Sequence, residues 1–331
     1  MVYRFACKKY RLPLRVPLRT AHGPWGEREG LLVRLEDESG GVGFGEIAPL
    51  PGFGTETVAE AEAACAGFGG QAEEAALDAV PERFGCVRFA LAAARMKVPA
   101  APRSTKLPVA ALLPAGRAAL AVLPDRLGAG FLAFKWKVGV EGAEDELGML
   151  DDLLGLLPDY TRLRLDANGA WDRRTAARWL ARCAERPIEF VEQPLAPDDP
   201  DGLTGLAADF PVSLALDESV TGLAAAREWQ GRGWRGVYVI KPALAGPLEA
   251  LGAWVDDTKA DVVISSAIET AVGRAAILRF VLARNLTRRA LGFGVGEIFG
   301  DRRWDGPVAG SLLDTGWADS VNSAEIWSAL N

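Results

Sequence analysis

The sequence predicts an α/β protein in which a parallel βα barrel follows a smaller N-terminal domain of mixed α and β character. Three observations favour this fold class. Short apolar runs, each followed by a helix-like segment, recur along the chain after residue 106. Most of these runs end in a charged or hydroxyl-bearing residue, and successive ones are 24 to 29 positions apart. The length of 331 residues gives room for one large and one small domain.

The N-terminal domain is predicted to begin with strands. Residues 2–14 are expected to form one strand. Residues 30–50 are expected to form two more, joined by a turn at Ser39-Gly40-Gly41, because glycine tolerates the positive φ of such turns. Thr57 and Glu60 then form the Ser/Thr-x-x-Glu pattern of a capping box, which predicts the start of a helix.

A second helix and a linker are expected to complete this domain. Residues 84–97 place their apolar side chains near helical spacing. The Pro-containing stretch 98–108 is predicted to be a linker, and the change of composition there sets the expected domains at 1–105 and 106–331.

Seven segments of the larger domain are predicted strands, because they are almost continuously apolar and alternate with helix-like segments, as in parallel βαβ units. They begin at residues 108, 131, 162, 188, 213, 236 and 261, and a weaker eighth candidate lies near 289. Eight such strands would close a barrel. An open doubly wound sheet is the alternative, but the Gly-rich turn expected after its first strand is missing.

The candidate chemistry lies at the strand ends. The polar residues there are Lys137, Asp166, Glu192, Asp217, Lys241 and Ser265. Because the carboxyl ends of barrel strands meet on one face, we expect these side chains to converge. Helix capping would explain one or two of the acids, but not three on successive strands. Converging carboxylates without histidine suit a hard cation, so Asp166, Glu192 and Asp217 are predicted Mg²⁺ ligands.

Asn168 and Glu218 are expected to support this site without binding the metal. Asn168 lies two residues beyond Asp166, although an Asn-Gly pair is as often only a turn. Glu218 follows Asp217 and, by strand alternation, should point to the other face.

Cations flank the three acids. Lys135 and Lys137 share one face of their strand, and Lys241 enters from the other side of the ligand set. Mutual repulsion and desolvation are expected to lower the pKa values of these lysines towards the range in which a neutral amine acts as a base. Arg164 lies on the same face as Asp166 and is a candidate substrate contact; an ion pair with an acid of a neighbouring strand is equally compatible with the sequence.

The composition excludes several classes of protein. With 37 basic and 44 acidic side chains the net charge is −7, and no basic block offers a surface for nucleic acid or an anionic membrane. No apolar run reaches the roughly 18 residues of a membrane helix, and no secretory signal is expected. The four cysteines are widely spaced and are expected to be reduced thiols of a cytoplasmic protein. His22 is the only histidine, so histidine-based zinc sites are excluded, and it is expected to lie in a loop.

Five short motifs together resemble the enolase superfamily, in its muconate-lactonizing subgroup. They are Phe134-Lys135-Trp136-Lys137, Leu165-Asp166-Ala167-Asn168, Val191-Glu192-Gln193-Pro194, Leu216-Asp217-Glu218-Ser219 and Ile240-Lys241-Pro242. The resemblance spans nearly the whole chain. It implies a modified TIM barrel, (β/α)₇β, with an N-terminal α+β capping domain on which the C-terminal segment packs. It also implies Mg²⁺ on the three carboxylates, with Mn²⁺ as a substitute.

Within this subgroup, residues 45–53, Glu56-Thr57 and residues 264–270 resemble the o-succinylbenzoate synthase family of menaquinone and phylloquinone biosynthesis. The resemblance implies Mg²⁺-dependent syn dehydration of 2-succinyl-6-hydroxy-2,4-cyclohexadiene-1-carboxylate to 2-succinylbenzoate through an enediolate. Lys137 would remove the proton and then protonate the leaving hydroxyl. Lys241 would lie as an ammonium against the ring, and Lys135 would keep Lys137 neutral and contact the substrate carboxylate.

Such a substrate is an anionic dicarboxylate and needs a second anion site. Candidate hydrogen-bond donors to its succinyl end are the two serines after the seventh strand and the backbone of a Gly-x-Gly-x-Gly run, because glycine permits close backbone approach. They are Ser265, Ser266, Gly292 and Gly294. By the resemblance, loops at 19–26 and 49–55 cover the barrel mouth, with glycine hinges at Gly23, Gly26, Gly52 and Gly54.

Two other functions compete with this one. Lysines on both faces of a site also suit an N-succinylamino acid racemase or a dipeptide epimerase of the same superfamily. Dipeptide epimerases carry an Asp-x-Asp pair near the last barrel strand, and residues 291–300 have none. A non-catalytic barrel that binds an acidic metabolite would not need a base on each face. The dehydratase is therefore favoured.

Overall fold

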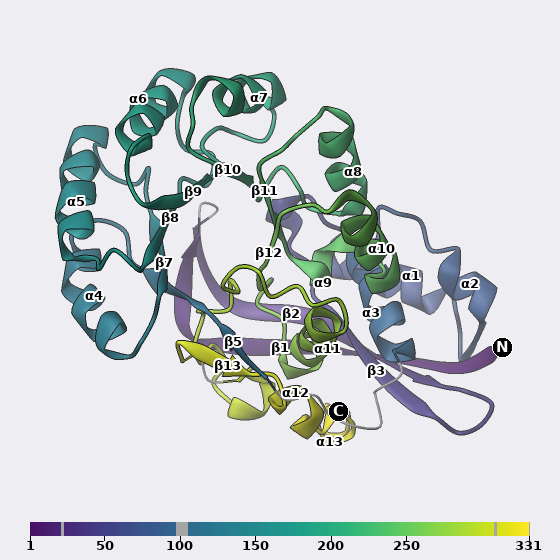
Figure 1. The fold of residues 1–331 in the computed structure, drawn as a ribbon. Helices are drawn as coiled ribbons and strands as arrows, with labels where there is room; N and C mark the ends of the chain where they lie inside the picture. The colour runs from purple at the N-terminus through teal and green to yellow at the C-terminus, as the bar shows by residue number, and fades with distance from the viewer. Residues whose placement is uncertain (21–22, 97–104, 308–309, 331) are drawn as a thin grey trace.

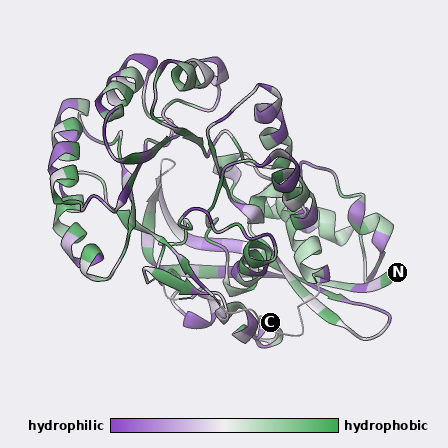
Figure 2. Cartoon of the chain, in the orientation of Figure 1, coloured by the Kyte–Doolittle hydropathy of each residue, from purple (hydrophilic) through white to green (hydrophobic). Residues whose placement is uncertain are grey.

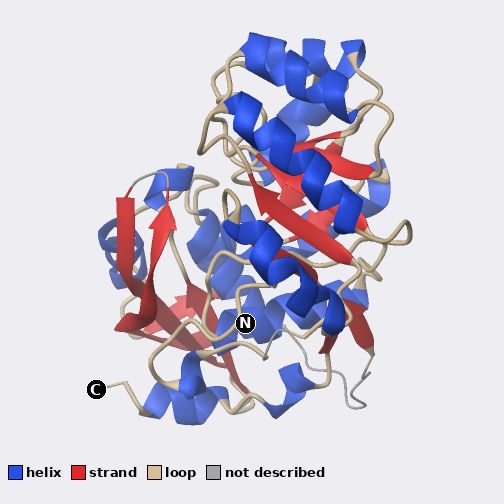
Figure 3. Ribbon diagram, turned by 90° about the vertical axis from the view of Figure 1, so that its left-hand side faces the viewer, coloured by secondary structure: helices blue, strands red, loops and turns tan. Residues whose placement is uncertain are grey.

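The computed structural model describes residues 1–20, 23–96, 105–307 and 310–330, so the predictions for His22 and residues 97–104 lie outside the described residues. Two sheets organise this part of the chain: a four-stranded antiparallel sheet from the N-terminal region and a seven-stranded parallel sheet (Figure 1). Figure 3 shows them side by side, with the N-terminal sheet at the left and the parallel strands at the upper right.

The N-terminal sheet has the strand order β3-β2-β1-β4. Its strands are β1 (Val2–Thr20), β2 (Gly23–Glu36), β3 (Val42–Ile47) and β4 (Gln71–Glu73). The first strand was expected to end at residue 14, but β1 continues to Thr20 after an irregularity between Pro13 and Leu18. Proline has no N–H to give the ladder, so pairing is interrupted there and then resumes. The predicted turn at Ser39-Gly40-Gly41 is confirmed, with Gly40 at φ +84°.

Three helices cover one face of this sheet: α1 (Val58–Ala66), α2 (Glu74–Asp78) and α3 (Gly85–Arg95). The capping box predicted from Thr57 and Glu60 is present at the start of α1. Helix α3 lies so close to β3 that a Cβ on Gly43 or Gly45 would come within 1.8 Å or 2.0 Å of a backbone carbonyl oxygen of α3. Glycine at alternate positions of β3 is therefore what allows the helix to dock.

The parallel sheet has the order β12-β11-β10-β9-β8-β7-β6 and curls into an arc with helices on its outside (Figure 1). Its strands are β6 (Ala110–Leu113), β7 (Ala133–Lys137), β8 (Arg162–Asp166), β9 (Ile188–Glu192), β10 (Leu214–Leu216), β11 (Val237–Ile240) and β12 (Val262–Ile264). The intervening helices are α4 (Ala118–Gly128), α5 (Ala143–Leu156), α6 (Arg173–Cys183), α7 (Pro200–Asp209), α8 (Leu223–Gly231), α9 (Pro242–Ala245), α10 (Leu248–Thr258) and α11 (Ala271–Ala283). All seven predicted strands are therefore confirmed.

The weaker eighth candidate closes the ring without forming a regular strand. Leu291 bridges to Val109 beside β6, and Gly292 bridges to Ser265 after β12. A Cβ on Gly292 would lie 2.5 Å from the Ser265 hydroxyl, so glycine is required for this approach. Together with the N-terminal sheet domain, this arrangement confirms the predicted fold class.

Residues 106–108, expected to belong to a linker, instead form strand β5 (Lys106–Pro108), which pairs antiparallel with β13 (Leu312–Asp314). The helices that follow are α12 (Trp317–Ser320) and α13 (Ser323–Ser328), and the short 3₁₀ helices are η1 (Pro51–Phe53) and η2 (Arg302–Trp304). The end of the chain reaches back to the N-terminal sheet. Lys8 on β1 donates to the carbonyl oxygens of Trp327 and Leu330, and the ring of Phe44 on β3 meets that of Trp327.

The core follows the layers. Figure 2 shows hydrophobic and hydrophilic stretches alternating along the outer helices, as expected when one helix face packs on the strands. Inside the ring, a separate buried cluster contains Phe190, Ala215, Val237, Val239 and Val263. None of the described helices is both long enough and apolar enough to cross a membrane.

One carboxylate from the N-terminal sheet joins it to the parallel barrel. Glu46 on β3 is fully buried and accepts hydrogen bonds from the Tyr10 hydroxyl (2.6 Å), from the backbone N–H and hydroxyl of Thr270 (2.9 and 2.6 Å) and from the backbone N–H of Gly273 (2.9 Å). Thr270 and Gly273 lie at the start of α11, where backbone N–H groups have no partner within the helix. Glu46 therefore caps a barrel helix from the other domain.

Candidate active site

A cavity of about 790 Å³ opens at the carboxyl ends of the barrel strands. The structure brings together there most of the residues that the sequence singled out. They are Lys135, Lys137, Asp166, Asn168, Glu192, Asp217, Glu218, Lys241, Ser265, Ser266 and Gly292. The strand register explains part of this convergence, because Lys137, Asp166 and Glu192 are paired in one row across β7, β8 and β9.

Lys135 lies between two of the acids. Its Nζ is 2.8 Å from Asp166 and 2.7 Å from Glu192. Burial alone would lower the pKa of Lys135, but attraction to these carboxylates outweighs it, and the pKa is raised above its usual range. The expectation of a lowered pKa is therefore wrong for Lys135, because its neighbours are acids and not the other lysines.

Lys241 faces the third acid from the next strand along the sheet. Its ammonium forms an ion pair with Asp217 and lies 4.5 Å from the centre of the Phe53 ring. Burial would raise the pKa of Asp217, but Lys241 and then Lys135 hold it below its usual range. Lys241 therefore has an anionic partner on one side and an aromatic face on the other.

Lys137 has a different kind of partner. Its Nζ donates to the side-chain oxygen of Asn168 at 2.7 Å, and among the described residues it forms no ion pair. The amide nitrogen of Asn168 donates in turn to Glu218 at 3.0 Å. Asn168 adopts φ +45°, a conformation that Asn tolerates better than most residues. The Asn-Gly pair is thus both a turn and a link between Lys137 and Glu218.

Glu218 was expected to point away from the site, but it lines the cavity. Strand β10 ends at Leu216, so strand alternation does not extend to Glu218. One of its oxygens accepts from Asn168, and the other is buried without a partner among the described residues. Burial, with repulsion from Asp217 and Asp166, raises the pKa of Glu218 to about 7.

The donor set fits a hard divalent cation. Asp166, Glu192 and Asp217 supply only oxygen atoms and come from neighbouring strands. Burial and then repulsion by Asp166 raise the pKa of Glu192 well above its usual range, and Lys135 opposes this rise. Among the described residues no three acidic, histidine or cysteine side chains stand in ligand geometry. This is because the three acids are paired with lysines instead: Lys135 lies between Asp166 and Glu192, and Lys241 forms an ion pair with Asp217.

The predicted anion donors divide into two groups. Ser265, Ser266 and Gly292 line the cavity, whereas Gly294 does not. A Cβ on Gly294 would lie 2.3 Å from the carbonyl oxygen of Ala110, so this glycine serves the approach to β6. The Ser266 hydroxyl is already engaged, because it accepts from Arg274 at 2.6 Å and donates to a carboxylate of its own loop.

Arg164 takes the second of its two expected roles. Its side chain is buried away from the cavity lining, and Nε donates to Glu189 at the start of β9, 2.6 Å away. Glu189 also pairs with Arg289, which binds Asp261 through two hydrogen bonds. This network lies two residues or more before the strand ends, too deep in the barrel for Arg164 to reach the mouth. The geometry does not support a substrate contact by Arg164.

Several cavity residues were not singled out from the sequence as substrate contacts, among them Leu113, Thr221, Val239 and Ile268. Phe53 also lines the cavity; it belongs to the loop 49–55, which the resemblance places over the barrel mouth. Its position follows from the turn at its own loop, where Thr55 accepts from the backbone of Leu50 at 2.8 Å. The regular pattern of polar residues at the strand ends does not predict that any of these residues lines the cavity.

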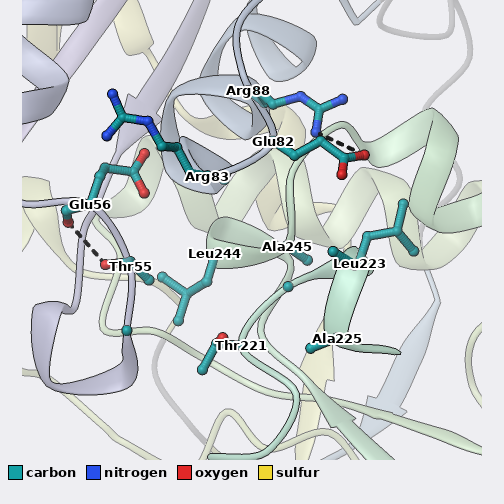
Figure 4. A pocket seen from close by; sticks show the side chains of 14 residues that line it. Thr55, Glu56, Glu82, Arg83, Arg88, Thr221, Leu223, Ala225, Leu244 and Ala245 are labelled. Carbon is teal, nitrogen blue, oxygen red and sulfur yellow. Dashed lines mark hydrogen bonds and ion pairs between the residues drawn. The ribbon is translucent and has the colours of Figure 1, made fainter. Parts of the chain in front are cut away.

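A smaller cavity of about 230 Å³ lies behind the same loop. Figure 4 shows Thr221 in the lower part of the view, and Arg88 paired with Glu82 in the upper part. The two cavities share Gly54 and Thr221 in their walls, so the loop that carries Phe53 has open space on its far side. Gly54 has φ +78°. Hinge roles for Gly23, Gly26, Gly52 and Gly54 remain predictions.

Comparisons with known proteins agree with this geometry. Residues 117–294 match the family described as enolase C-terminal domain-like, and residues 3–98 match the family described as MenC, N-terminal domain. An o-succinylbenzoate synthase of Thermosynechococcus vestitus is 43% identical over 298 residues, which are 88% of this chain and 92% of that protein. One from Pectobacterium atrosepticum is 32% identical over 82% of this chain and 84% of its own length.

Solved structures give the same result. The crystal structure of o-succinylbenzoate synthase from Thermosynechococcus elongatus BP-1, complexed with Mg in the active site, matches with a TM-score of 0.88 and 40% identity, covering 99% of this chain and all (100%) of that one. The L-Ala-D/L-Glu epimerase from Bacillus subtilis, at 23% identity and a TM-score of 0.76 over 93% of this chain and 94% of that one, shares the fold. The chain therefore belongs to the o-succinylbenzoate synthase family of the enolase superfamily and is a lyase of the dehydratase kind.

Proposed function

We propose that this enzyme dehydrates 2-succinyl-6-hydroxy-2,4-cyclohexadiene-1-carboxylate to 2-succinylbenzoate in menaquinone or phylloquinone biosynthesis. One observation carries the assignment of roles. Of the three lysines in the cavity, Lys135 and Lys241 are paired with carboxylates, whereas the one hydrogen bond of Lys137 to a described residue goes to the neutral amide of Asn168. The ion pairs engage Lys135 and Lys241 with acids, so Lys137 is the lysine best placed to act as the base.

The arrangement of the cavity orients the substrate. Its ring carboxylate would lie beside Asp166, Glu192 and Asp217, with Lys135 close enough to contact it. These three acids would hold Mg²⁺, with Mn²⁺ as a substitute, and the bound ion would supply Lewis-acid stabilisation of the charge that develops on the substrate carboxylate. The succinyl chain would then extend across the mouth towards Ser265, Ser266 and Gly292, on the other side of the ring of strands.

Lys137 would carry both proton transfers. Its neutral Nζ takes the proton from C1, the carbon that bears the carboxylate. The resulting ammonium then donates that proton to the hydroxyl on C6, which leaves as water while the ring becomes aromatic. Since one residue serves both steps, the proton and the hydroxyl must leave from the same face. Lys241 remains an ammonium, fixed by Asp217, and contacts the other face of the ring.

The direct test is incubation of the purified protein and Mg²⁺ with the cyclohexadiene substrate, while its absorbance is followed. We expect the absorbance to fall and 2-succinylbenzoate to accumulate. An unchanged absorbance would contradict the proposed function.

The racemase remains the second candidate because Lys137 and Lys241 enter the cavity from β7 and from the end of β11. A racemase needs both lysines to exchange protons with substrate. Loss of α-deuterium from N-succinylamino acids, without any dehydration of the cyclohexadiene, would favour the racemase.

The four cysteines support the expected compartment. Cys65, Cys86 and Cys183 are buried, Cys7 is partly buried, and all four are free thiols. Free thiols are usual in reducing compartments, so we place this enzyme in the cytoplasm.

A further inference from the structure

The backbone of Ile268 is held in a conformation that its side chain disfavours. Ile268 has φ +59°, in the left-handed region, where a β-branched residue is a clear outlier. The same residue lines the active-site cavity. Outliers of this kind persist only where surrounding contacts enforce them, and they gather at functional sites. The contacts that enforce this one therefore bear on the shape of the cavity.

Two hydrogen bonds hold the peptide groups on either side of Ile268. Its N–H donates to the hydroxyl of Ser266 at 2.9 Å. Its carbonyl oxygen accepts from Nε of Arg28 at 3.0 Å. The first contact lies within the same loop, whereas the second comes from β2 of the N-terminal sheet.

Arg28 is a buried cation whose hydrogen bonds, among the described residues, go only to backbone carbonyl groups, and whose guanidinium lies 5.4 Å from the centre of the Trp25 ring. Its side chain is 2% exposed, and Nη1 donates to the carbonyl oxygens of Pro49 (2.7 Å) and Glu29 (2.9 Å). No described acidic side chain forms an ion pair with it, and Nη2 has no partner. A guanidinium is costly to bury without a carboxylate. The planar guanidinium is well suited to bind carbonyl groups from separate segments of the chain.

Ile268 lies two strands beyond the last of the three acids along the ring of strands. Asp166, Glu192 and Asp217 belong to β8, β9 and the end of β10, whereas Ile268 follows β12. Ser265 and Ser266 lie next to it on the same loop. A substrate whose ring carboxylate lies at the acids and whose acyl chain extends to Ser265 and Ser266 would therefore bring that chain beside Ile268.

We propose that Ile268 is a specificity-determining wall for the acyl chain of the substrate, and that Arg28 is the positioning residue that holds it there. This inference rests on the proposed function, which fixes the direction of the acyl chain. In this arrangement the N-terminal sheet shapes the barrel's substrate site through the hydrogen bond from Arg28 to the carbonyl oxygen of Ile268. The side chain of Arg28 itself does not touch the substrate.

Ligand binding tests this proposal. The protein, with Mg²⁺, is titrated with 2-succinylbenzoate and with benzoate, which keeps the ring carboxylate but lacks the acyl chain. We expect Arg28→Met to lower the affinity for 2-succinylbenzoate about tenfold and to leave the affinity for benzoate unchanged within a factor of two. Arg34→Met is the matched control, because Arg34 lies on the same strand and pairs with Glu36; both affinities should remain at the wild-type value.

A second variant separates positioning from a merely structural role. Glycine adopts positive φ without strain, so Ile268→Gly loses the wall but keeps the loop conformation without help from Arg28. We expect Ile268→Gly alone to weaken 2-succinylbenzoate about tenfold. Adding Arg28→Met in that background should weaken it by less than a further factor of two. Ile268→Gly also keeps the test decisive if Arg28→Met does not fold.

Hydrogen exchange gives a readout that needs no ligand. Arg28→Met should speed amide exchange in residues 265–270, and Arg34→Met should not. Three results would each overturn the proposal. Arg28→Met could lower the affinities for both ligands equally, it could keep its full tenfold effect in the Ile268→Gly background, or it could leave amide exchange in this loop unchanged. Wild-type protein that binds benzoate but not 2-succinylbenzoate would contradict the proposed function, and the inference with it.

Discussion

Nζ of Lys137 donates a hydrogen bond to the side-chain oxygen of Asn168, 2.7 Å away, and the amide nitrogen of Asn168 donates in turn to Glu218. The amide thus separates the lysine from the nearest carboxylate of this chain of contacts. An amide orients an amine without stabilising its charge as a carboxylate would. The roles proposed for these residues lead to the following expectations.

Replacing Lys137 removes the group proposed to move the proton. We expect Lys137→Ala to lower kcat by at least about 10³-fold, with a circular dichroism spectrum and an affinity for 2-succinylbenzoate close to those of the wild type. Lys9→Ala is the matched control, because Lys9 lies on β1 of the N-terminal sheet and makes only a 3.7 Å ion pair with Glu62. Full activity in Lys137→Ala would rule out the proposed base.

Replacing Asn168 by aspartate tests the neutral contact. Asp keeps the shape of Asn and tolerates the positive φ of this position. A carboxylate beside Lys137 favours its ammonium, so more alkaline conditions are needed to make the base. We expect the pH at which kcat/KM rises to move up by about one unit. The measurement is a pH–rate profile of both proteins; identical profiles would mean that this contact does not influence the base.

Replacing Glu192 by glutamine should have opposite effects on stability and on metal binding. Glu192 is buried beside two other acids, so a neutral isostere relieves repulsion. We expect the Tm of the chelator-treated variant to equal or exceed that of wild type. The rise in Tm on addition of Mg²⁺ should be lost, along with activity. In the wild type, chelation should abolish activity and Mg²⁺ should restore it; activity that survives chelation would exclude the proposed role of the metal.

The deep barrel network should make stability depend on acid pH. Hydrogen bonds from Arg289 hold the pKa of Asp261 below its usual range. Its stabilising effect is therefore complete above the unfolded-state pKa of about 4 and is lost as the pH falls through the lower folded-state value. We expect Asp261→Asn to reduce the free energy of unfolding by about 1 kcal/mol at pH 7.

Urea denaturation at pH 7, 5 and 3 measures this difference. The gap between wild type and Asp261→Asn should persist at pH 5 and shrink at pH 3. Asp159→Asn, on an exposed residue, provides the control. A gap that does not change between pH 7 and pH 3 would argue against an ionic contribution from Asp261.

The sequence predicts best what depends on local periodicity. The lysines and acids at the strand ends converge as expected, because βα units repeat at a regular spacing and parallel strands end on one face. Arg164 shows that this argument predicts the face on which a side chain lies but not its contacts. Alternation places it correctly on the face of Asp166, but depth along the strand decides what it meets, and at its level it meets Glu189.

Contacts between segments far apart in the chain are not visible in the sequence. The position of Phe53 against Lys241 depends on how the N-terminal domain docks on the barrel mouth. The same is true of Arg28 and Ile268, which are 240 residues apart and meet through backbone and not through complementary charges. The alternation of side chains along a strand does not apply to Glu218, because β10 ends two residues before it.

The carboxylate of Glu46 has consequences beyond the contacts that it makes. Because it completes the first turn of α11 from a strand of the N-terminal sheet, neither part of the chain contains all the partners that its own buried groups need. The two parts should therefore unfold in a single cooperative transition. A hybrid with the N-terminal domain of a more distant superfamily member would keep its catalytic lysines and still be unstable, unless Tyr10, Glu46 and Thr270 were transferred as one unit.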